Sequence, residues 1–510
     1  MPNEPEIASV AQADVEVGLP FDEFSPEELL HPESLRAVHV PKAAAGEPGL
    51  WAVERRQLTL GLVLTITLVA AEALAVSTAT VVVVRDLGGL DLYGLVFSAF
   101  LIGSLLGIVV VGGLIDRMGV VRPFLGGLGL FAIGLTLAGL APSMPFLIGA
   151  RFVQGVGGGA IPPVAYVAIG RALPERLRPR MFALLSTAWI LPGVFGPAIA
   201  GIVAQQLHWR LVFLGLLPLI AVSGAMAVRG LSSLPPFPAR PTGSLARRIA
   251  DGLVVAAGVA LITAGLSSEE PGLAVVGGVV GAVVTLAAVR RLTPPGTLRL
   301  SPGYPAAIFL RGLLTLAFFS IDAYVALLLV GVRGWSAGEA GIAVTGATVS
   351  WTIGSWVQAR LSDRTSPERF VRAGFPIVAI GIAGLAPVLV APVPAAFAVV
   401  AFTVAGFGMG LAYSQFAVIV LRDVEQHAQG RVTAGLTLSD SVGTALGTGI
   451  SAALVAAAIR SGSGPAPGIA VAIAIGTVLA LAGFVLSPRL WRPAAEAIAG
   501  RAGEAAEGVR

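Results

Sequence analysis

The chain of 510 residues is 55% hydrophobic, only 12% charged and free of cysteine. Average soluble domains carry about 25% charged residues, so this composition excludes an ordinary soluble protein and places most side chains against lipid or one another. The absence of cysteine excludes disulfides and thiolate metal sites. The net charge of +4 comes from arginines in short connections rather than on a basic soluble face, which excludes nucleic acid as a partner.

Residues 1–50 differ from the rest, with ten acidic residues against Arg36 and Lys42. No basic segment followed by an apolar run begins the chain, so we expect no cleavable signal peptide. A segment this charged and this poor in apolar residues cannot form a core. It predicts a disordered acidic cytosolic tail.

From Leu58 onward, apolar runs of 18 residues or more recur, and about 20 residues cross a hydrocarbon core. The breaks between them carry Pro, Gly and Arg. This pattern predicts an all-α integral membrane protein with fourteen transmembrane helices, at 57–84, 93–115, 122–141, 145–170, 181–205, 210–229, 250–267, 272–289, 304–330, 337–359, 371–391, 394–421, 432–459 and 467–488.

The basic residues indicate orientation, because cytoplasmic loops are enriched in Lys and Arg. With the N-terminus inside, the cytoplasmic segments hold 27 basic residues and the outer segments hold 4, while Arg151 and Arg311 are embedded. The asymmetry predicts cytoplasmic N- and C-termini and a multi-pass protein of the cell membrane. All four histidines lie in predicted tails or loops, so none is placed to relay protons through the membrane interior. The sequence has no His/Asp cluster of the kind that binds a metal, and we expect no metal site.

Polar, proline-containing connections at 230–248 and 290–305 divide the helices as 6 + 2 + 6. Leu-Ile-Asp116-Arg117 follows the second helix, and Leu-Ser-Asp363-Arg364 follows the second helix of the last six. Such a repeat predicts two homologous halves with a site between them. The expected domains are a tail, an N-terminal six-helix bundle, a two-helix linker, a C-terminal six-helix bundle and a cytosolic tail, at 1–50, 51–230, 231–300, 301–490 and 491–510.

Residues 112–119 read GGLIDRMG between the second and third predicted helices. The pattern resembles the G-x-L-x-D-R-x-G loop motif of the major facilitator superfamily. Small residues allow close packing, and the aspartate can lie against the positive N-terminal end of a neighbouring helix. The resemblance implies a latch that closes the cytoplasmic side, built from Gly112, Asp116, Arg117 and Gly119 and, in the repeat, from Asp363 and Arg364.

Further motifs follow in the order found in that superfamily. Arg151 and Gln154 open the fourth helix in a segment that resembles R-x-x-Q-G, whose arginine is tied to proton coupling in the family. Trp209-Arg210 opens the sixth helix, as W-R-x-V-F does in the drug:proton antiporters. The fifth helix resembles the G-P-x-x-x-G motif of exporters, through Gly193, Gly196, Pro197 and Gly201. With the 6 + 2 + 6 count, the chain resembles the fourteen-helix drug:proton antiporters, which implies their fold.

Charged side chains inside predicted spans are functional candidates, because lipid disfavours them. Glu72 lies near the middle of the first helix, Asp322 at a comparable depth in the ninth and Asp440 in the thirteenth. Burial disfavours the charged form of a carboxylate, which can then hold a proton and release it when a cation or arginine approaches. We predict proton coupling at Glu72, assisted by Asp322, Asp440, Arg151 and Arg311. The alternative is that these groups form ion pairs that only hold helices together.

The substrate cavity is predicted to be largely apolar. Its candidate residues are Gln154, Phe318, Phe319 and Gln415, with Phe402, Phe407 and Phe416 as further aromatics. For each aromatic the alternative is ordinary packing.

These features predict a secondary active transporter, not an enzyme, that exports amphipathic drug-like or lipid-like small molecules by alternating access. The proton gradient is the expected energy source, with no cofactor, and membrane lipid is the other expected partner. One alternative is an importer or facilitator of the same fold, against which the fifth-helix motif argues. A second is a non-transporting membrane receptor or scaffold, against which the repeat and the buried acids argue. The sequence leaves open the substrate, the oligomeric state and the role of the two extra helices.

Overall fold

The computed structural model describes residues 49–88, 92–232, 244–266, 268, 270–390 and 392–491. The acidic segment predicted as a tail therefore lies outside the described residues, apart from its last two positions, as does the chain after Trp491. Within the described ranges every regular element is a helix and no strand occurs. Eleven helices there are long and apolar enough to cross a membrane.

The first half of the chain forms eight α-helices around the predicted spans. They are α1 (Val53–Leu87), α2 (Tyr93–Met118), α3 (Val121–Gly139), α4 (Met144–Ala172), α5 (Arg178–Thr187), α6 (Ile190–Ile202), α7 (Arg210–Leu214) and α8 (Leu217–Ser232). The two extra predicted helices are α9 (Leu245–Leu266) and α10 (Pro271–Leu292). The last part forms α11 (Tyr304–Leu327), α12 (Ala337–Leu361), α13 (Pro367–Ala383), α14 (Phe397–Asp423), α15 (Gln429–Arg460) and α16 (Ala466–Leu486).

Two spans predicted as single helices are interrupted, and proline explains both breaks. Pro192 has no N–H for the carbonyl of Ala188, and the helix breaks between α5 and α6 at that turn. Pro218 likewise leaves the carbonyl of Leu214 without its helical partner, and the chain turns between α7 and α8. A π-helical segment, Val203–His208, follows α6. The predicted helix 181–205 is thus a jointed element rather than a uniform rod.

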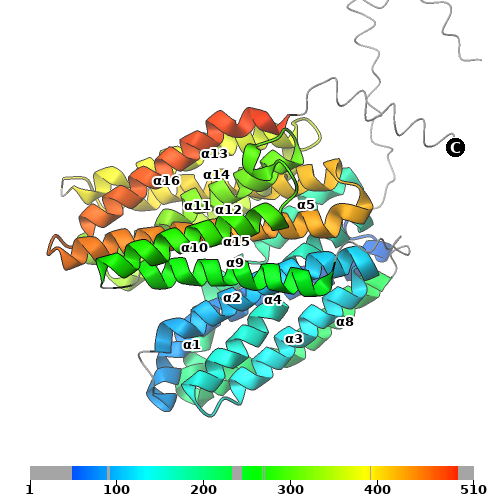
Figure 1. Cartoon of the computed structure of the whole chain (residues 1–510), viewed down its shortest axis with the longest axis horizontal. Coiled ribbons are helices and arrows are strands. Elements are labelled where there is room, and N and C mark those ends of the chain that lie inside the picture. Colours follow the sequence, from blue (N-terminus) through cyan, green and yellow to red (C-terminus); the bar gives the residue numbers. More distant parts are fainter. Residues whose placement is uncertain are drawn as a thin grey trace, which may run out of the picture. The chain divides into compact units, whose positions relative to one another are not determined.

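The two halves repeat one packing pattern. In the first half α4 packs on α2 and α3, and α1 packs on α6 and α8. In the second half α14 packs on α12 and α13, and α11 packs on α15 and α16. Figure 1 shows the first group in blue to teal and the second group in yellow-green to red. The repeated contacts agree with the internal repeat read from the sequence.

Glycines set the closest helix contacts in both halves. A Cβ on Gly159 of α4 would lie 2.1 Å from the carbonyl oxygen of Ser104 in α2. At the equivalent place, 251 residues further along the chain, a Cβ on Gly410 of α14 would lie 2.0 Å from the carbonyl oxygen of Trp351 in α12. Only glycine allows these backbones to touch, which is how helices without a hydrophobic driving force associate in lipid.

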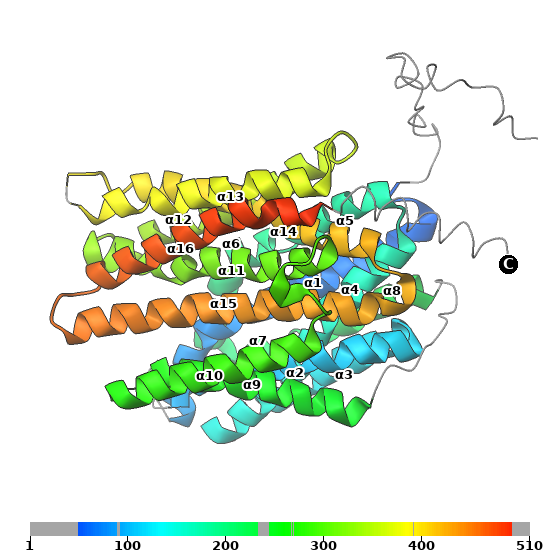
Figure 2. The same ribbon diagram turned by 45° about the horizontal axis from the view of Figure 1, so that its top comes forward.

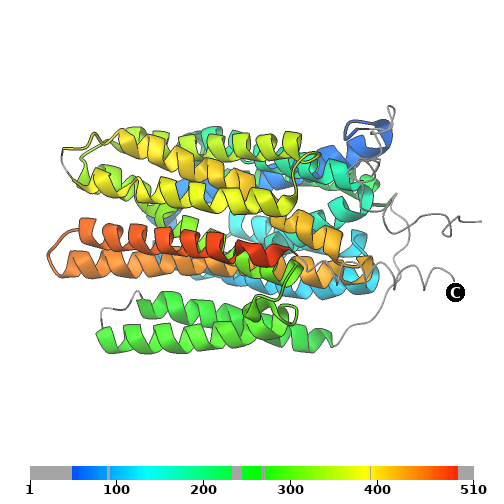
Figure 3. The ribbon, with the colours of Figure 1, turned by 90° about the horizontal axis from the view of Figure 1, so that it is seen from above.

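The α9–α10 hairpin packs on both halves. Helix α9 contacts α2 of the first half and α15 of the second, and α10 packs along α9. Figures 2 and 3 show the green hairpin beside the orange α15. The contact is a separate apolar cluster that joins Val255, Ala256 and Val259 to Leu105, Ile108 and Val109 and to Ala434, Leu438 and Val442.

Candidate functional site

The predicted acid of the first helix lies in a buried ion pair. Glu72 of α1 is fully buried and contacts the guanidinium of Arg151 in α4, which is 3% exposed. Arg151 also donates to the side-chain oxygen of Gln154 at 2.6 Å, and it lies over the ring of Phe100 with 4.4 Å to the ring centroid. Two groups predicted separately, an acid and the arginine of the fourth-helix motif, thus form one cluster inside the first half.

This cluster is incompletely satisfied. Among the described residues, the second carboxylate oxygen of Glu72 and the amide nitrogen of Gln154 are buried and have no hydrogen-bond partner. An unpartnered buried polar atom is costly, and it is commonly retained where it exchanges a proton or receives a ligand. Glu72 therefore binds Arg151 with one carboxylate oxygen, and its other oxygen is available to take up a proton or contact a ligand.

A second buried cluster joins the two halves. Arg311 of α11 pairs with Asp440 of α15, with Nε–Oδ1 and Nη2–Oδ2 distances of 3.3 Å. The Tyr413 hydroxyl of α14 donates to Asp440 at 2.9 Å, and the guanidinium lies 3.4 Å from the Tyr413 ring centroid. From the other half, the Tyr166 hydroxyl of α4 accepts a bond from Arg311 at 3.3 Å. Sequence reasoning named Arg311 and Asp440 without pairing them, and it missed both tyrosines.

Asp322 does not repeat the environment of Glu72. It lies 250 residues after Glu72, in the equivalent helix, but it is only partly buried and has no ion pair or hydrogen bond among the described residues. The position equivalent to Arg151, 251 residues later, is Phe402 rather than an arginine. The acid–arginine pair therefore belongs to one half alone, and the two predicted acids have different chemistry.

The predicted cavity aromatics form a row in the second half. Phe318 stacks on Phe402 with centroids 5.3 Å apart and meets Phe319 and Trp351 edge-on. Trp351 in turn packs against Tyr413, which links the row to the Arg311 cluster. Phe318 and Phe402 are buried by these contacts.

Gln415 lies elsewhere. It is 1% exposed and hydrogen-bonds to Gln358, whose amide also reaches the hydroxyl of Ser414 at 3.3 Å and the carbonyl of Pro179 at 3.5 Å. The structure therefore places Gln415 in the contact between the halves, near the start of α5. Phe407 and Phe416 belong to α14 as well, and Phe416 is fully buried.

The aspartate of the first loop motif lies at the N-terminus of α15. Asp116, at the end of α2, is 1% exposed, and its Oδ2 accepts the backbone N–H of Arg431 at 3.0 Å. The first turn of a helix has N–H groups without partners and a partial positive charge, so a carboxylate stabilises it. We call this contact between α2 and α15 the latch. The motif implied a carboxylate against a helix N-terminus, and its role in closing the cytoplasmic side stays a prediction.

Glycines shape the latch. A Cβ on Gly112 would lie 2.5 Å from Cβ of Ala434, so a side chain there would separate α2 from α15. Gly119 ends α2 with φ of 76°, a conformation that favours glycine. Arg117 lies between them in the last turn of α2 and is partly buried.

The repeated motif makes a weaker contact. Asp363, after α12, reaches the guanidinium of Arg180 in α5 at 3.7 Å, and the two side chains are 56% and 46% exposed. Arg180 and Arg431 are 251 residues apart and occupy equivalent helix starts. However, α5 has Pro179, which lacks an N–H, where α15 has Gly430. Arg364 is exposed.

The fifth-helix motif lies in α6, between the two halves. Gly196 faces Leu74 of α1, with 3.8 Å between an added Cβ and the Leu74 Cβ, and Gly193 faces Thr348 of α12 at 3.9 Å. Gly201 lies one residue before the end of α6, and the backbone of Pro197 continues the helix. These small residues allow α6 to approach both α1 and α12.

The Trp209-Arg210 motif contacts Asp86 at the C-terminal end of α1. The Trp209 indole donates to Asp86 at 2.8 Å, and Arg210 reaches the same carboxylate at 3.3 Å. The Trp209 hydrogen bond, followed by the charge of Arg210, holds the pKa of Asp86 below its ordinary value of 3.8. Asp86 was not singled out from the sequence, although it lies beside the predicted end of the first helix.

The family model of the Major Facilitator Superfamily matches residues 60–448. A probable multidrug-efflux transporter of Mycobacterium tuberculosis is 27% identical over 420 residues, which cover 79% of this chain and 88% of that protein. The multidrug transporter protein MdtP of Bacillus subtilis is 25% identical over 422 residues, 80% of this chain and 76% of that protein.

Solved structures show the same fold. The human organic anion transporter MFSD10 has a TM-score of 0.63 at 15% identity, with 85% of this chain and 99% of that chain covered. The proton:xylose symporter XylE has a TM-score of 0.59 at 13% identity, with 84% and 94% covered. The helical halves, the latch and the family match agree, and this multi-pass membrane protein, a transporter of small molecules rather than an enzyme, belongs to the Major Facilitator Superfamily.

Proposed function

We propose that this transporter exports amphipathic drug-like or lipid-like compounds in exchange for protons. The observation that carries the proposal is the buried pair of Glu72 with Arg151, in which one carboxylate oxygen of Glu72 has no partner among the described residues. A buried ion pair stabilises a fold only when further hydrogen bonds satisfy its remaining polar atoms. A carboxylate with a spare oxygen suits a group that must gain and lose a proton.

In this proposal a proton arriving at Glu72 removes the negative charge that holds Arg151. The arginine then keeps only its bonds to Gln154 and to the carbonyl oxygen of Val96, and its contact with the Phe100 ring. Because α1, α2 and α4 share this cluster, the change in charge alters how they pack. Release of the proton restores the pair. A cationic substrate near Glu72 favours that release, which couples the two movements.

We propose that the hydrogen bonds of the second cluster change when one half of the transporter moves against the other. Arg311, Asp440 and Tyr413 belong to the second half, and Tyr166 belongs to the first. Rocking of one half against the other breaks the bond to Tyr166 while the pair of Arg311 with Asp440 persists. Asp322, whose side chain has no ion pair or hydrogen bond within the described part of the chain, lies one turn after Phe318 and is the proposed auxiliary acid on the substrate side.

We further propose fourteen spans in a 6 + 2 + 6 arrangement, with cytoplasmic termini and the domain boundaries given above. Each predicted span coincides with one helix or with two jointed helices. The 27 to 4 distribution of basic residues supports the orientation, and it makes the latch a cytoplasmic gate. The multidrug-efflux relatives and the aromatic row around Phe318 support an amphipathic substrate in the bacterial cell membrane.

Everted membrane vesicles test the proposal. Vesicles with the wild-type chain should accumulate a lipophilic cation when an inward-acid gradient is applied, and should lose it when the gradient is collapsed. The Glu72→Gln variant should bind the cation without gradient-driven accumulation. Accumulation of the cation that does not depend on the pH gradient would contradict proton exchange. Accumulation only in right-side-out vesicles would favour an importer.

A further inference from the structure

A basic pocket lies between the extra helices and the second half. It has a volume of about 410 Å³ and is lined by residues of α9, α10 and α15, with Ser244 just before α9. Four arginines, namely Arg247, Arg248, Arg291 and Arg431, face it with one acid, Asp251. The pocket shares no residue with the Glu72–Arg151 cluster, which is the proposed proton site, or with the Arg311–Asp440 cluster.

The pocket carries an excess of positive charge. Asp251 lies 4.0 Å from Arg291, at the edge of ion-pair distance, and the charge of Asp116 also acts on Arg248 and Arg431, so two carboxylates stand against four guanidinium groups. Arg248 is partly buried, and the negative charge of Asp116 and the positive charges of Arg431 and Arg117 all act on it. Arginine presents several N–H donors in a plane and binds phosphate oxygens in pairs. A phosphate group is the ligand that such a set recognises.

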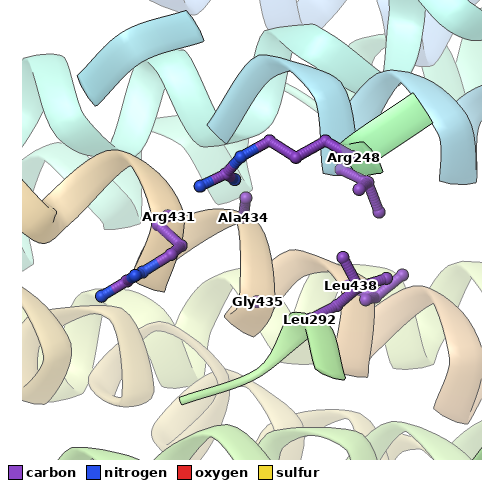
Figure 4. Close-up of a pocket in the computed structure, with 7 residues that line it drawn as sticks. Arg248, Leu292, Arg431, Ala434, Gly435 and Leu438 are labelled. Atoms are coloured by element: carbon purple, nitrogen blue, oxygen red, sulfur yellow. The ribbon is translucent and has the colours of Figure 1, made fainter. Parts of the chain in front are cut away.

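One side of the pocket is apolar. Leu292 lines it beside the arginines, and a narrower cavity shares Arg248, Leu292 and Arg431 with it and continues between α9 and α15 along Val109, Ala434 and Leu438. Figure 4 shows this narrower cavity, with the guanidinium groups of Arg248 and Arg431 on one side and the side chains of Leu292 and Leu438 on the other. Beyond Arg291, α10 presents a row of exposed apolar side chains, Val283, Val279 and Val276, that are 62%, 58% and 58% exposed. A ligand in the pocket therefore meets the arginines and Leu292, and the exposed valines lie further along the same helix as Arg291.

From these observations we propose that the pocket binds the phosphate headgroup of an anionic phospholipid whose acyl chains lie along α10. The pocket opens between helices of a membrane protein, and basic pockets of this kind fit lipid headgroups. A soluble phosphate compound would use the arginines but not the apolar row. The inference does not depend on proton exchange or on the direction of transport.

The bound headgroup would also act on the latch. Arg431 contributes its side chain to the pocket and its backbone N–H to Asp116. Arg248 lies against α2, where a Cβ on Gly113 would be 2.6 Å from Arg248 Cδ. Because α9 packs on α2, a headgroup that bridges α9 and α15 holds α2 near α15 and stabilises the closed latch.

The test measures lipid retained by the purified full-length protein. Protein in detergent is incubated with equal amounts of phosphatidylglycerol and phosphatidylcholine of the same chain length, then washed, and bound lipid is counted by mass spectrometry. The variant is Arg247→Gln/Arg291→Gln, because both side chains are exposed and the latch does not use them. The matched control is Arg369→Gln/Arg489→Gln, two exposed arginines outside the pocket. A parallel arm adds millimolar inorganic phosphate.

The wild type and the control should retain phosphatidylglycerol over phosphatidylcholine. Each arginine near a membrane surface contributes about fivefold to anionic-lipid affinity, so the pocket variant should lose roughly 25-fold. Inorganic phosphate should not displace the lipid. Equal retention by the pocket variant and the control would overturn the proposal. So would displacement by inorganic phosphate, which would identify a soluble phosphate site instead.

Discussion

The carboxylate of Asp116 accepts the backbone N–H of Arg431 at 3.0 Å, across 315 residues of sequence. The bond ties the end of α2 in the first half to the first turn of α15 in the second. Its repeat, Asp363 with Arg180, is a solvent-exposed ion pair at 3.7 Å. One motif occurs twice, but only one copy forms a buried latch. Gly430 leaves room for the Asp116 carboxylate, since an added Cβ would lie 2.4 Å from its Oδ1, and Pro179 fills the equivalent position in α5.

Asp116→Asn should open the latch more often. Asparagine keeps an acceptor but loses the charge that interacts with the helix dipole, a contribution of about 1 kcal/mol that shifts the closed population roughly fivefold. Because the chain has no cysteine, a single cysteine placed in the latch can be labelled with a thiol reagent. The labelling rate should rise severalfold in Asp116→Asn. Asp363→Asn is the matched control and should change it little, since exposed ion pairs contribute less. Equal effects of the two variants would contradict the asymmetry.

Glu72→Gln should abolish gradient-driven export while the protein stays folded. Glutamine has a similar shape and keeps an acceptor for Arg151, but it cannot exchange a proton. It also leaves a buried positive charge, so Tm should fall measurably. Transport in vesicles and Tm in detergent check the two effects. Export at the wild-type rate would remove Glu72 from the coupling mechanism.

Asp440→Asn and Tyr166→Phe should differ in their effect on stability. Asp440 neutralises Arg311, which is 1% exposed, so its loss should cost about 3 kcal/mol. Tyr166 supplies one hydrogen bond at 3.3 Å, and its loss should cost about 1 kcal/mol. Thermal unfolding of both variants in the same detergent should show a larger fall in Tm for Asp440→Asn than for Tyr166→Phe. A Tyr166→Phe loss as large as that of Asp440→Asn would contradict the pairing of Arg311 with Asp440.

Gly159→Ala should destabilise the contact of α2 with α4. The added methyl would lie 2.1 Å from the carbonyl oxygen of Ser104, and overpacking of this kind costs about 1–3 kcal/mol. Gly126→Ala is the control, because nothing lies within 4 Å of its added Cβ. Alanine is the better helix former, so Tm should stay or rise in the control and fall by several degrees in Gly159→Ala. A fall of equal size in both would contradict the close approach of Gly159 to Ser104 as the cause of the destabilisation.

The Asp86 contact gives the protein a sensitivity to acid. The pKa of Asp86 is lowered in the folded state, so the carboxylate stabilises the protein above the ordinary value of 3.8, and this contribution is lost as the pH falls through the lower folded pKa. Tm of the wild type should exceed that of Asp86→Asn near neutral pH, and the difference should shrink below pH 3.8. The effect is small, because the carboxylate is 49% exposed. A Tm difference between the wild type and Asp86→Asn that grows as the pH falls would contradict a lowered pKa of Asp86 in the folded state.

Several parts of the site were within reach of the sequence. Glu72 and Arg151 stand out because charges inside apolar spans are rare, and Asp116 stands out in a motif whose partner type was implied. Tyr166 and Tyr413 were missed, although tyrosines inside apolar helices need a partner for the hydroxyl, which is a usable signal. The 251-residue spacing of Arg180 and Arg431 was also readable. The difference between the first turns of α5 and α15 was less evident, because it depends on Pro179 beside Arg180 and Gly430 beside Arg431.

By itself the sequence determined that the chain is an all-helical membrane protein, where its helices lie and how its halves repeat. Hydropathy over about 20 residues and the placement of arginines are local properties, which need no partner to be read. The tertiary structure decided the rest. Glu72 meets Arg151 across 79 residues, Arg311 meets Asp440 across 129, and Asp322 meets neither arginine. Such pairs depend on which helix faces come together, and glycine contacts scattered along the chain set those faces.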